Sequence, residues 1–439
     1  MRLFVRAGKP FALACSLFYV LPTQAATLEE TVAKALDTNP QTLISLQRYR
    51  AGTAAIGSAK SGYLPSLDLA TGIGHQRKSS PGTRASGEDN TDFTRRELSL
   101  SLRQMIFDGF ATSSEVDRTT NENLAQASTL SSTAENVALR VAEVYLNVLE
   151  KQQLLELAER NLKTHNRIFQ QIRLRAESGV SRSSDLAQIT GRRARAKTNV
   201  INAKNNLMDA EAEFFRVVNL VPAKLVIPRP NHKYLPLNMQ AAVKQATENH
   251  PTLVSASYDI KAAESQYEAS KSPFMPRVDF EVDQTWDRDN DGVHGRDNDL
   301  TAMVRMRYNL FNGFGDKARK EESAYRVEEA RAVKKNAYRQ VVEGLKLSWN
   351  AYRYLNEQKV SLKQHVNSSR QTVSAYQQQF NIGKRTLLDL LDSENELFQA
   401  RQAYIEADYD ELLSRYRVFN ATGQLLPALN VKLPDAWTR

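Results

Sequence analysis

Two aspartates in the last quarter of the chain have the spacing that most suggests chemistry. Asp389 and Asp392 lie three positions apart in the segment Phe380–Asp392, and residues three apart lie on the same side of an α-helix. Carboxylates on one helix face can attract cations. The alternative is that both are solvated side chains that cap a returning helix.

The sequence does not indicate an enzyme. The six histidines have no metal-ligand spacing, and no nucleophile elbow or acid–base pair occurs. Gly383 and Lys384 lack the earlier glycine of a phosphate loop, and Arg385 stands where Ser or Thr is needed. Asp287–Gly292 begins like a calcium loop, but its twelfth position is Asn298, so we interpret it as a polar turn. We therefore expect no catalysis, no cofactor and no firm metal site.

The N-terminus predicts export. A basic head of Arg2, Arg6 and Lys9 precedes the apolar stretch Phe11–Leu21, and a small-x-small pattern follows it. This is typical of a cleaved secretory signal, which we place at residues 1–25, and the stretch is too short to span a bilayer. The alternative is a short buried helix.

The exported part of the chain has a restricted chemistry. The single cysteine, Cys15, lies in the signal, so no disulfide can form after cleavage. No later apolar run reaches the length of about 18 residues that a membrane helix needs, so a membrane crossing would not use helices. The formal charge is +9. In an exported protein this indicates a solvated or membrane-surface face rather than nucleic acid.

The chain is a tandem repeat. Leu64–Asp68 recurs as Met275–Asp279, and Ile106–Phe110 recurs as Leu310–Phe314, each roughly 200 residues later. The spacing shortens between the two matches, which marks the intervening stretch as an exposed loop. The predicted division is a signal peptide (1–25), a first helix–hairpin–helix repeat (26–221), a Pro-rich equatorial linker (222–238), a second repeat (239–424) and a C-terminal tail (425–439).

Each repeat has the same order of elements. A helix of about 35 residues, at 28–62 and 239–272, ends before a proline. Two segments of about ten residues follow, in which apolar and charged residues alternate as in a tilted membrane strand. A long helix then carries apolar residues at a seven-residue spacing, which indicates coiled-coil packing. The predicted strands are about 64–75 and 94–105 in the first repeat and about 276–287 and 299–310 in the second.

The longest helix must extend well beyond a globular domain. No glycine or proline lies between Phe110 and Gly179, and a helix of about 65 residues is roughly 100 Å long. Such helices must pack side by side as a tube or rod. Four strands cannot close a barrel, and lipid does not tolerate an open sheet edge, so several chains must share one barrel. Two chains would supply eight strands and three would supply twelve, and the long hairpins favour the wider barrel.

The segments Leu64–Leu69, Gln104–Phe110 and Gly383–Asp392, together with the repeat, resemble the TolC family of outer-membrane factors. The resemblance covers nearly all of the exported chain. It implies an α+β membrane protein, a homotrimer with a twelve-stranded β-barrel and an α-helical periplasmic tunnel, located in the cell outer membrane and extending into the periplasm. Residues 95–104 and 134–146 look most like members that serve type I secretion of large adhesins.

The expected function is that of an exit duct in a tripartite type I secretion system. The duct would pass substrate, a large adhesin-type protein, from an inner-membrane ABC transporter and a periplasmic adaptor (membrane fusion) protein to the cell exterior. One alternative is the outer-membrane factor of a multidrug efflux pump driven by protons. A further alternative is a soluble periplasmic coiled-coil scaffold. The expected partners are two more copies of the chain, the adaptor, the transporter and outer-membrane lipid, but not nucleic acid.

The resemblance also implies a periplasmic gate at the helical turns. Arg385 matches an arginine that latches the closed state, and its expected acceptor is Asp185. Under threefold symmetry, Asp389 and Asp392 would form stacked acidic rings that bind divalent or trivalent cations. Phe380 stands where efflux members often carry tyrosine, and a phenyl ring cannot donate that hydrogen bond. The turns expected to contact the adaptor contain Gly179, Val180, Ser181, Gly383 and Lys384.

Overall fold

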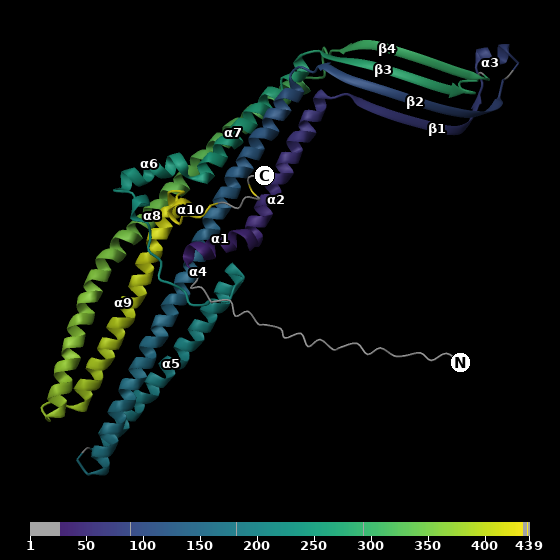
Figure 1. Cartoon of the computed structure of the whole chain (residues 1–439). Helices are drawn as coiled ribbons and strands as arrows, with labels where there is room; N and C mark the ends of the chain where they lie inside the picture. Colours follow the sequence, from purple (N-terminus) through teal and green to yellow (C-terminus); the bar gives the residue numbers. More distant parts are fainter. Residues whose placement is uncertain (1–26, 88, 181, 293, 433–436, 438–439) are drawn as a thin grey trace, which may run out of the picture.

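Two long helical hairpins and a four-stranded sheet lie at opposite ends of an elongated molecule (Figure 1). The computed structural model describes residues 27–87, 89–180, 182–292, 294–432 and 437, so the expected signal peptide lies outside the described residues. The helices are α1 (Leu28–Thr38), α2 (Pro40–Lys60), α3 (Pro81–Ala85), α4 (Ala111–Glu177), α5 (Ser183–Val218), α6 (Met239–Asn249), α7 (Pro251–Ala269), α8 (Gly315–Asn381), α9 (Leu387–Ala421) and α10 (Leu425–Ala428). The strands are β1 (Ser66–Lys78), β2 (Thr91–Phe107), β3 (Arg277–Arg288) and β4 (Arg296–Arg307).

The helix predicted at the start of each repeat is in fact two helices. Asn39 and His250 adopt extended backbone between α1 and α2 and between α6 and α7. The Asn39 side chain accepts the N–H of Gln41 at 2.9 Å, and a proline follows each break at the first helical position. Because an N-cap residue has non-helical backbone, and a residue before proline avoids the α region, the expectation of one continuous helix was wrong.

The long helices are as predicted. α4 and α8 each contain 67 residues without a break, and each packs along a shorter partner, α5 or α9, to form a hairpin (Figure 1). None of the helices in the described ranges is long and apolar enough to cross a bilayer.

The corner between β2 and α4 explains the recurring Phe-Asp/Asn-Gly-Phe motif. Gly109 and Phe110 both have positive φ, and the Asp108 carboxylate accepts the N–H of Thr112 at 2.8 Å. A Cβ on Gly109 would lie 2.8 Å from the carbonyl oxygen of Ser272. Only glycine fits this position, since it needs both positive φ and close approach of another backbone.

The four antiparallel strands lie in the order β1-β2-β3-β4. Leu67 is opposite Leu102, Leu102 opposite Val282, and Val282 opposite Ala302. Directly opposite residues share a face, so the register places the apolar positions of all four strands together. This apolar face is exposed in the single chain, with exposed fractions of 68% for Leu69 and 64% for Val304.

The other face of the sheet carries charge, and some of it is covered. Asp279 and Glu281 are 0% and 4% exposed. Arg307 donates to both carboxylates at 3.0 and 2.7 Å, while Arg277 donates to Asp279 and Arg305 to Glu281. Buried carboxylates are tolerated when they are paired in this way. The sheet therefore has apolar residues on its exposed face and paired charges on its other face.

The largest apolar core lies midway along the helices, where α1, α4, α5, α9 and α10 meet. Val141 and Val144 of α4 and Phe419 of α9 are almost fully buried there. The Tyr145 hydroxyl donates to the Val226 carbonyl oxygen at 2.7 Å and accepts the Val226 N–H at 2.9 Å. These bonds attach the Pro-rich segment 222–238 to the core. Within this segment the structure describes one short 3-10 turn, at His232–Tyr234.

Glu135 of α4 attaches the C-terminal segment to the same core. Its carboxylate is 5% exposed and accepts the N–H groups of Leu425 and Leu426 at 3.0 and 3.1 Å. Burial raises the pKa of Glu135 to about 7, although both hydrogen bonds favour the charged form.

Glu135→Ala is expected to leave two buried N–H groups without an acceptor, at a cost of about 1–3 kcal/mol each. Hydrogen exchange at Leu425 and Leu426 should accelerate, whereas exchange in the distant hairpin turns should not change. Glu135→Gln retains one carbonyl oxygen and should show a smaller effect. Equal protection in wild type and Glu135→Ala would contradict this anchoring role.

Candidate functional site

The two hairpin turns at the end away from the sheet have the same backbone structure. Gly179 and Gly383 have φ of +75° and +78°. The residue after each glycine donates its N–H to a carbonyl oxygen five residues earlier in the preceding helix. Val180 donates to Arg175 and Lys384 donates to Gln379, both at 2.8 Å. This pattern ends a helix with a residue in the left-handed region, which glycine adopts without strain. Ser181, expected to contact a partner, lies outside the described residues.

An apolar cluster joins the two hairpins near their turns. Phe380 is 8% exposed within it, and the Arg175 guanidinium lies over the ring at 5.2 Å. The ring is therefore a packing residue in this structure rather than part of a hydrogen-bonded latch. The cluster contains Ile168, Ile172, Ile189, Phe380, Leu387, Leu390 and Leu391.

Asp389 caps the helix on which it lies. The Thr386 hydroxyl accepts the Asp389 N–H at 3.3 Å, and the Asp389 carboxylate accepts the Thr386 N–H at 3.2 Å. The hydrogen bonds from Thr386, and then the charge of Arg385, hold the pKa of Asp389 below its usual range. This is a reciprocal capping box, which was the alternative interpretation of this aspartate.

Asp392 connects the two hairpins. Its carboxylate accepts a hydrogen bond from Arg192 of α5 at 2.5 Å. The Arg192 side chain is 28% exposed and that of Asp392 is 57% exposed. A pair this accessible contributes about 0.2–1 kcal/mol, so it biases the relative position of the hairpins without locking them.

Arg385 does not contact Asp185 within the described part of one chain. Its Nε donates to the Gln379 side chain at 3.0 Å, and its guanidinium lies 4.3 Å from the centre of the Tyr376 ring. Asp185 lies in the first turn of α5, where the N-cap residue is Arg182 and makes no side-chain cap. Asp389 forms a capping box, but the Asp185 carboxylate does not. The pairing of Asp185 with Arg385 stays a prediction for the assembled protein.

Sequence reasoning missed Arg192, Gln379 and Tyr376. The contacts of Gln379 and Tyr376 with Arg385 span a helix end and a turn, and Arg192 contacts a residue 200 positions away. An arginine on a charged helix surface carries no local signal that distinguishes it from its neighbours Arg193 and Arg195. The capping box was readable, because Thr386 stands three residues before Asp389.

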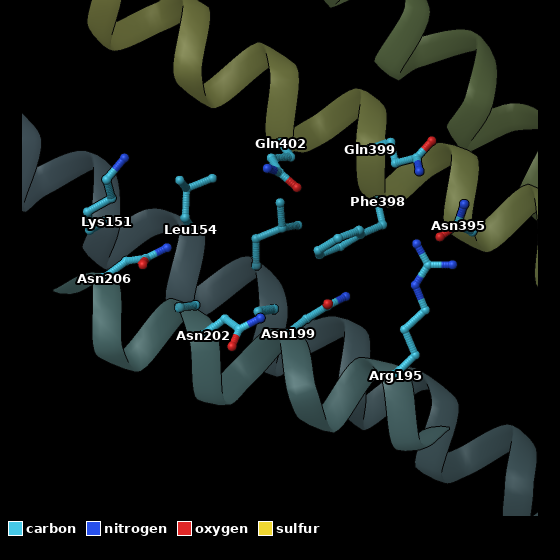
Figure 2. Close-up of a pocket in the computed structure, with 13 residues that line it drawn as sticks. Lys151, Leu154, Arg195, Asn199, Asn202, Asn206, Asn395, Phe398, Gln399 and Gln402 are labelled. Carbon is cyan, nitrogen blue, oxygen red and sulfur yellow. The ribbon is translucent and has the colours of Figure 1, made fainter. Parts of the chain in front are cut away.

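Between the turns and the equatorial core, polar side chains line the contact between the hairpins. A cavity of about 260 Å³ lies between α4, α5 and α9. Figure 2 shows three asparagines of α5 below it and Phe398 of α9 pointing into it. Amide side chains can exchange partners or water more readily than an interlocked apolar core can. The labelled lining residues are Lys151, Leu154, Arg195, Asn199, Asn202, Asn206, Asn395, Phe398, Gln399 and Gln402.

The cluster at the turns predicts the effect of truncating Phe380. Phe380→Ala is expected to cost about 3–5 kcal/mol of local packing energy and to accelerate hydrogen exchange in the last turns of α4 and α8. Ile382→Ala is the matched control, since Ile382 lies in the same turn and is 67% exposed. Indistinguishable exchange in the two variants would show that Phe380 does not hold the hairpins together.

A sequence profile described as "Outer membrane efflux protein" matches residues 31–219 and 242–424, which is most of the chain. The chain is 24% identical over 422 residues to the outer membrane efflux protein BepC of Brucella suis, covering 94% of this chain and 90% of BepC. It is 24% identical to the outer membrane protein TolC of Escherichia coli (92% and 83% covered). It is 22% identical to the alkaline protease secretion protein AprF of Pseudomonas aeruginosa (88% and 82% covered).

Solved structures share the fold at lower identity. The CmeC outer membrane channel of Campylobacter jejuni superimposes with a TM-score of 0.79 at 13% identity, covering 97% of this chain and 94% of CmeC. The outer membrane protein VceC of Vibrio cholerae gives 0.76 at 14% identity, with 93% and 97% covered.

Proposed function

This chain belongs to the outer membrane efflux protein family, and we propose that it is the exit duct of a tripartite type I secretion system. It is an outer-membrane transport protein with the helical-tunnel and β-barrel fold of that family. The substrate would be a large adhesin-type protein. The partners would be a periplasmic adaptor and an inner-membrane ABC transporter.

The arrangement of apolar and charged residues on the two faces of the sheet supports this proposal. Its apolar face is exposed, whereas Asp279 and Glu281 are covered on the opposite face. That arrangement suits a sheet with lipid on one side and an aqueous lumen on the other. β1 and β4 each have one edge with no partner strand in the described chain, and lipid does not tolerate unpaired edges. Pairing of β4 with β1 of the next copy in a homotrimer would close twelve strands.

The hairpins supply the proposed tunnel and its gate. Three copies would place six hairpins around an axis, with the turns at the periplasmic end. The Phe380 cluster and the Arg192–Asp392 pair are the contacts that would hold them closed. Arg385 would reach Asp185 only in the assembled trimer, and Asp389 and Asp392 would then ring the entrance.

The exposed turns are the proposed adaptor contact. Val180 is 78% exposed, and Gly179, Gly383 and Lys384 are exposed beside it or in the matching turn. An apolar side chain this accessible at a helix turn suits a protein contact.

The sequence segments 95–104 and 134–146 favour secretion over drug efflux, and AprF is a secretion protein by name. The second candidate is the outer-membrane factor of an efflux pump, which the efflux protein BepC favours. A soluble scaffold is the weaker third candidate because it would not need an exposed apolar sheet face.

Deletion of the gene separates these candidates. Secretion predicts loss of a large protein from the cell surface with unchanged drug susceptibility, and efflux predicts the reverse. The purified protein should need detergent for extraction and should migrate as a heat-sensitive trimer on gels. Release from the periplasm without detergent would support the scaffold and contradict both channel functions.

The gate assignment makes a separate prediction for planar bilayers. Asp389→Asn with Asp392→Asn should reduce cation selectivity and block by divalent cations, because acidic rings attract cations. Arg192→Gln removes the contact between hairpins but keeps both carboxylates. It should raise the open population by up to about fivefold, the equivalent of about 1 kcal/mol, while cation selectivity is kept. Unchanged selectivity in the double variant would refute the acidic rings.

A further inference from the structure

Three arginines form a row across neighbouring strands of the sheet. The register places Arg96 of β2 directly opposite Arg288 of β3, and Arg288 directly opposite Arg296 of β4. Directly opposite residues share a face and lie about 5 Å apart, so the three guanidinium groups project from one side of the sheet. Like charges in such positions destabilise a sheet, so the row requires a counter-charge.

Protein side chains supply little of that counter-charge. Within the described ranges, neither Arg96 nor Arg296 forms an ion pair, and the Nε of Arg288 lies 3.7 Å from an Asp289 carboxylate oxygen. By contrast, Arg77, further out on the same face, donates two hydrogen bonds to Asp92 at 2.7 and 2.9 Å. The row is thus an exception on this face.

The row marks the boundary of the apolar face on the side of the strand tips. The next row inward contains Leu98 and Trp286, directly opposite each other, and Ile73 stands opposite Arg96. The arginines, Ile73, Leu98 and Trp286 line a hollow of about 520 Å³. Glu97, which pairs with Arg95, and Asp287 also line it, but their positions in the strands alternate with those of the row and belong to the other face. Tryptophan at the end of an apolar band is typical of the membrane–water interface. The arginines lie in the next row toward the strand tips. With Trp286 at the edge of the hydrocarbon, they would therefore lie level with the lipid headgroups.

We propose that Arg96, Arg288 and Arg296 form a binding site for the phosphate of a lipid headgroup in the outer leaflet. This inference rests on the proposed function, because it requires the apolar face to contact lipid and the strand tips to face outward. Guanidinium groups bind phosphate through paired hydrogen bonds. Ile73, Leu98 and Trp286 would contact the glycerol or acyl part of the same molecule, which favours a phosphorylated lipid over free phosphate. A trimer would carry three such rows around its rim.

The fluorescence of Trp286 can report which lipid lies next to the arginine row. In a Trp349→Phe, Trp437→Phe background Trp286 is the remaining tryptophan of the three in the chain. The trimer is reconstituted into phosphatidylcholine vesicles containing a minor fraction of phosphatidic acid, with bromine on either lipid. At equal bromine content, brominated phosphatidic acid should quench Trp286 more strongly than brominated phosphatidylcholine. Arg96→Gln, Arg288→Gln and Arg296→Gln together should abolish the excess, with roughly a fivefold loss of preference per arginine.

Two control variants make the result specific. The triple lysine variant keeps the charge and should retain part of the preference. Arg326→Gln, Arg331→Gln and Arg353→Gln remove three exposed arginines of α8 that pair with glutamates of α8, and in the case of Arg331 also with Glu264 of α7. They lie far from the sheet and should leave the preference unchanged. Both should form the heat-sensitive trimer.

The possible outcomes separate the two proposals. If neither brominated lipid quenches Trp286, the sheet does not insert, and the proposed channel function fails. If both quench equally, the sheet inserts but the phosphate site is refuted. Loss of the excess on addition of inorganic phosphate would show a free-anion site and would also overturn the lipid assignment.

Discussion

The outer edges of β1 and β4 impose the main constraint on this molecule. Each strand has more than ten residues, and every unpaired N–H and C=O along its edge is costly in hydrocarbon. A soluble protein can leave an edge to water, but this sheet exposes its apolar side chains instead. The proposed homotrimer would pair these edges and leave none of them open to lipid. The strand lengths, the exposed apolar face and the paired charges of the other face all agree with that arrangement.

The helical part is stabilised differently at its two ends. Around the equator a continuous apolar core joins α1, α4, α5, α9 and α10, and Glu135 and Tyr145 attach the connecting segments to it. Toward the turns the contact between the hairpins consists of a cavity lined by both polar and apolar side chains, a small apolar cluster and an exposed ion pair. The apolar contact between the hairpins is therefore smaller toward the turns than around the equator, and the proposed gate lies at the end with the smaller contact.

Much of this architecture could be predicted from the sequence, for local reasons. The absence of glycine and proline between Phe110 and Gly179 predicts the long α4, and alternation predicts the strands. The break at Asn39 was missed, although the proline beside it was a signal, because helical periodicity continues across it. The contact of Arg192 with Asp392 could not be found, because it depends on how two hairpins pack. The acidic pair is the intermediate case: the shared helix face and the cap at Asp389 were readable, but whether the two carboxylates also line a pore depends on the assembly.

The corner at Gly109 and Phe110 has a mechanical consequence. It is the joint at which the sheet turns into α4, and Phe314 occupies the matching joint before α8. A helix of 67 residues is about 100 Å long. A tilt of about 3° at the joint would therefore displace the far end of such a helix by about 5 Å. The length of the helix amplifies a small change of angle next to the sheet. At the opposite end of the protein that change becomes a displacement about as large as an amino-acid side chain.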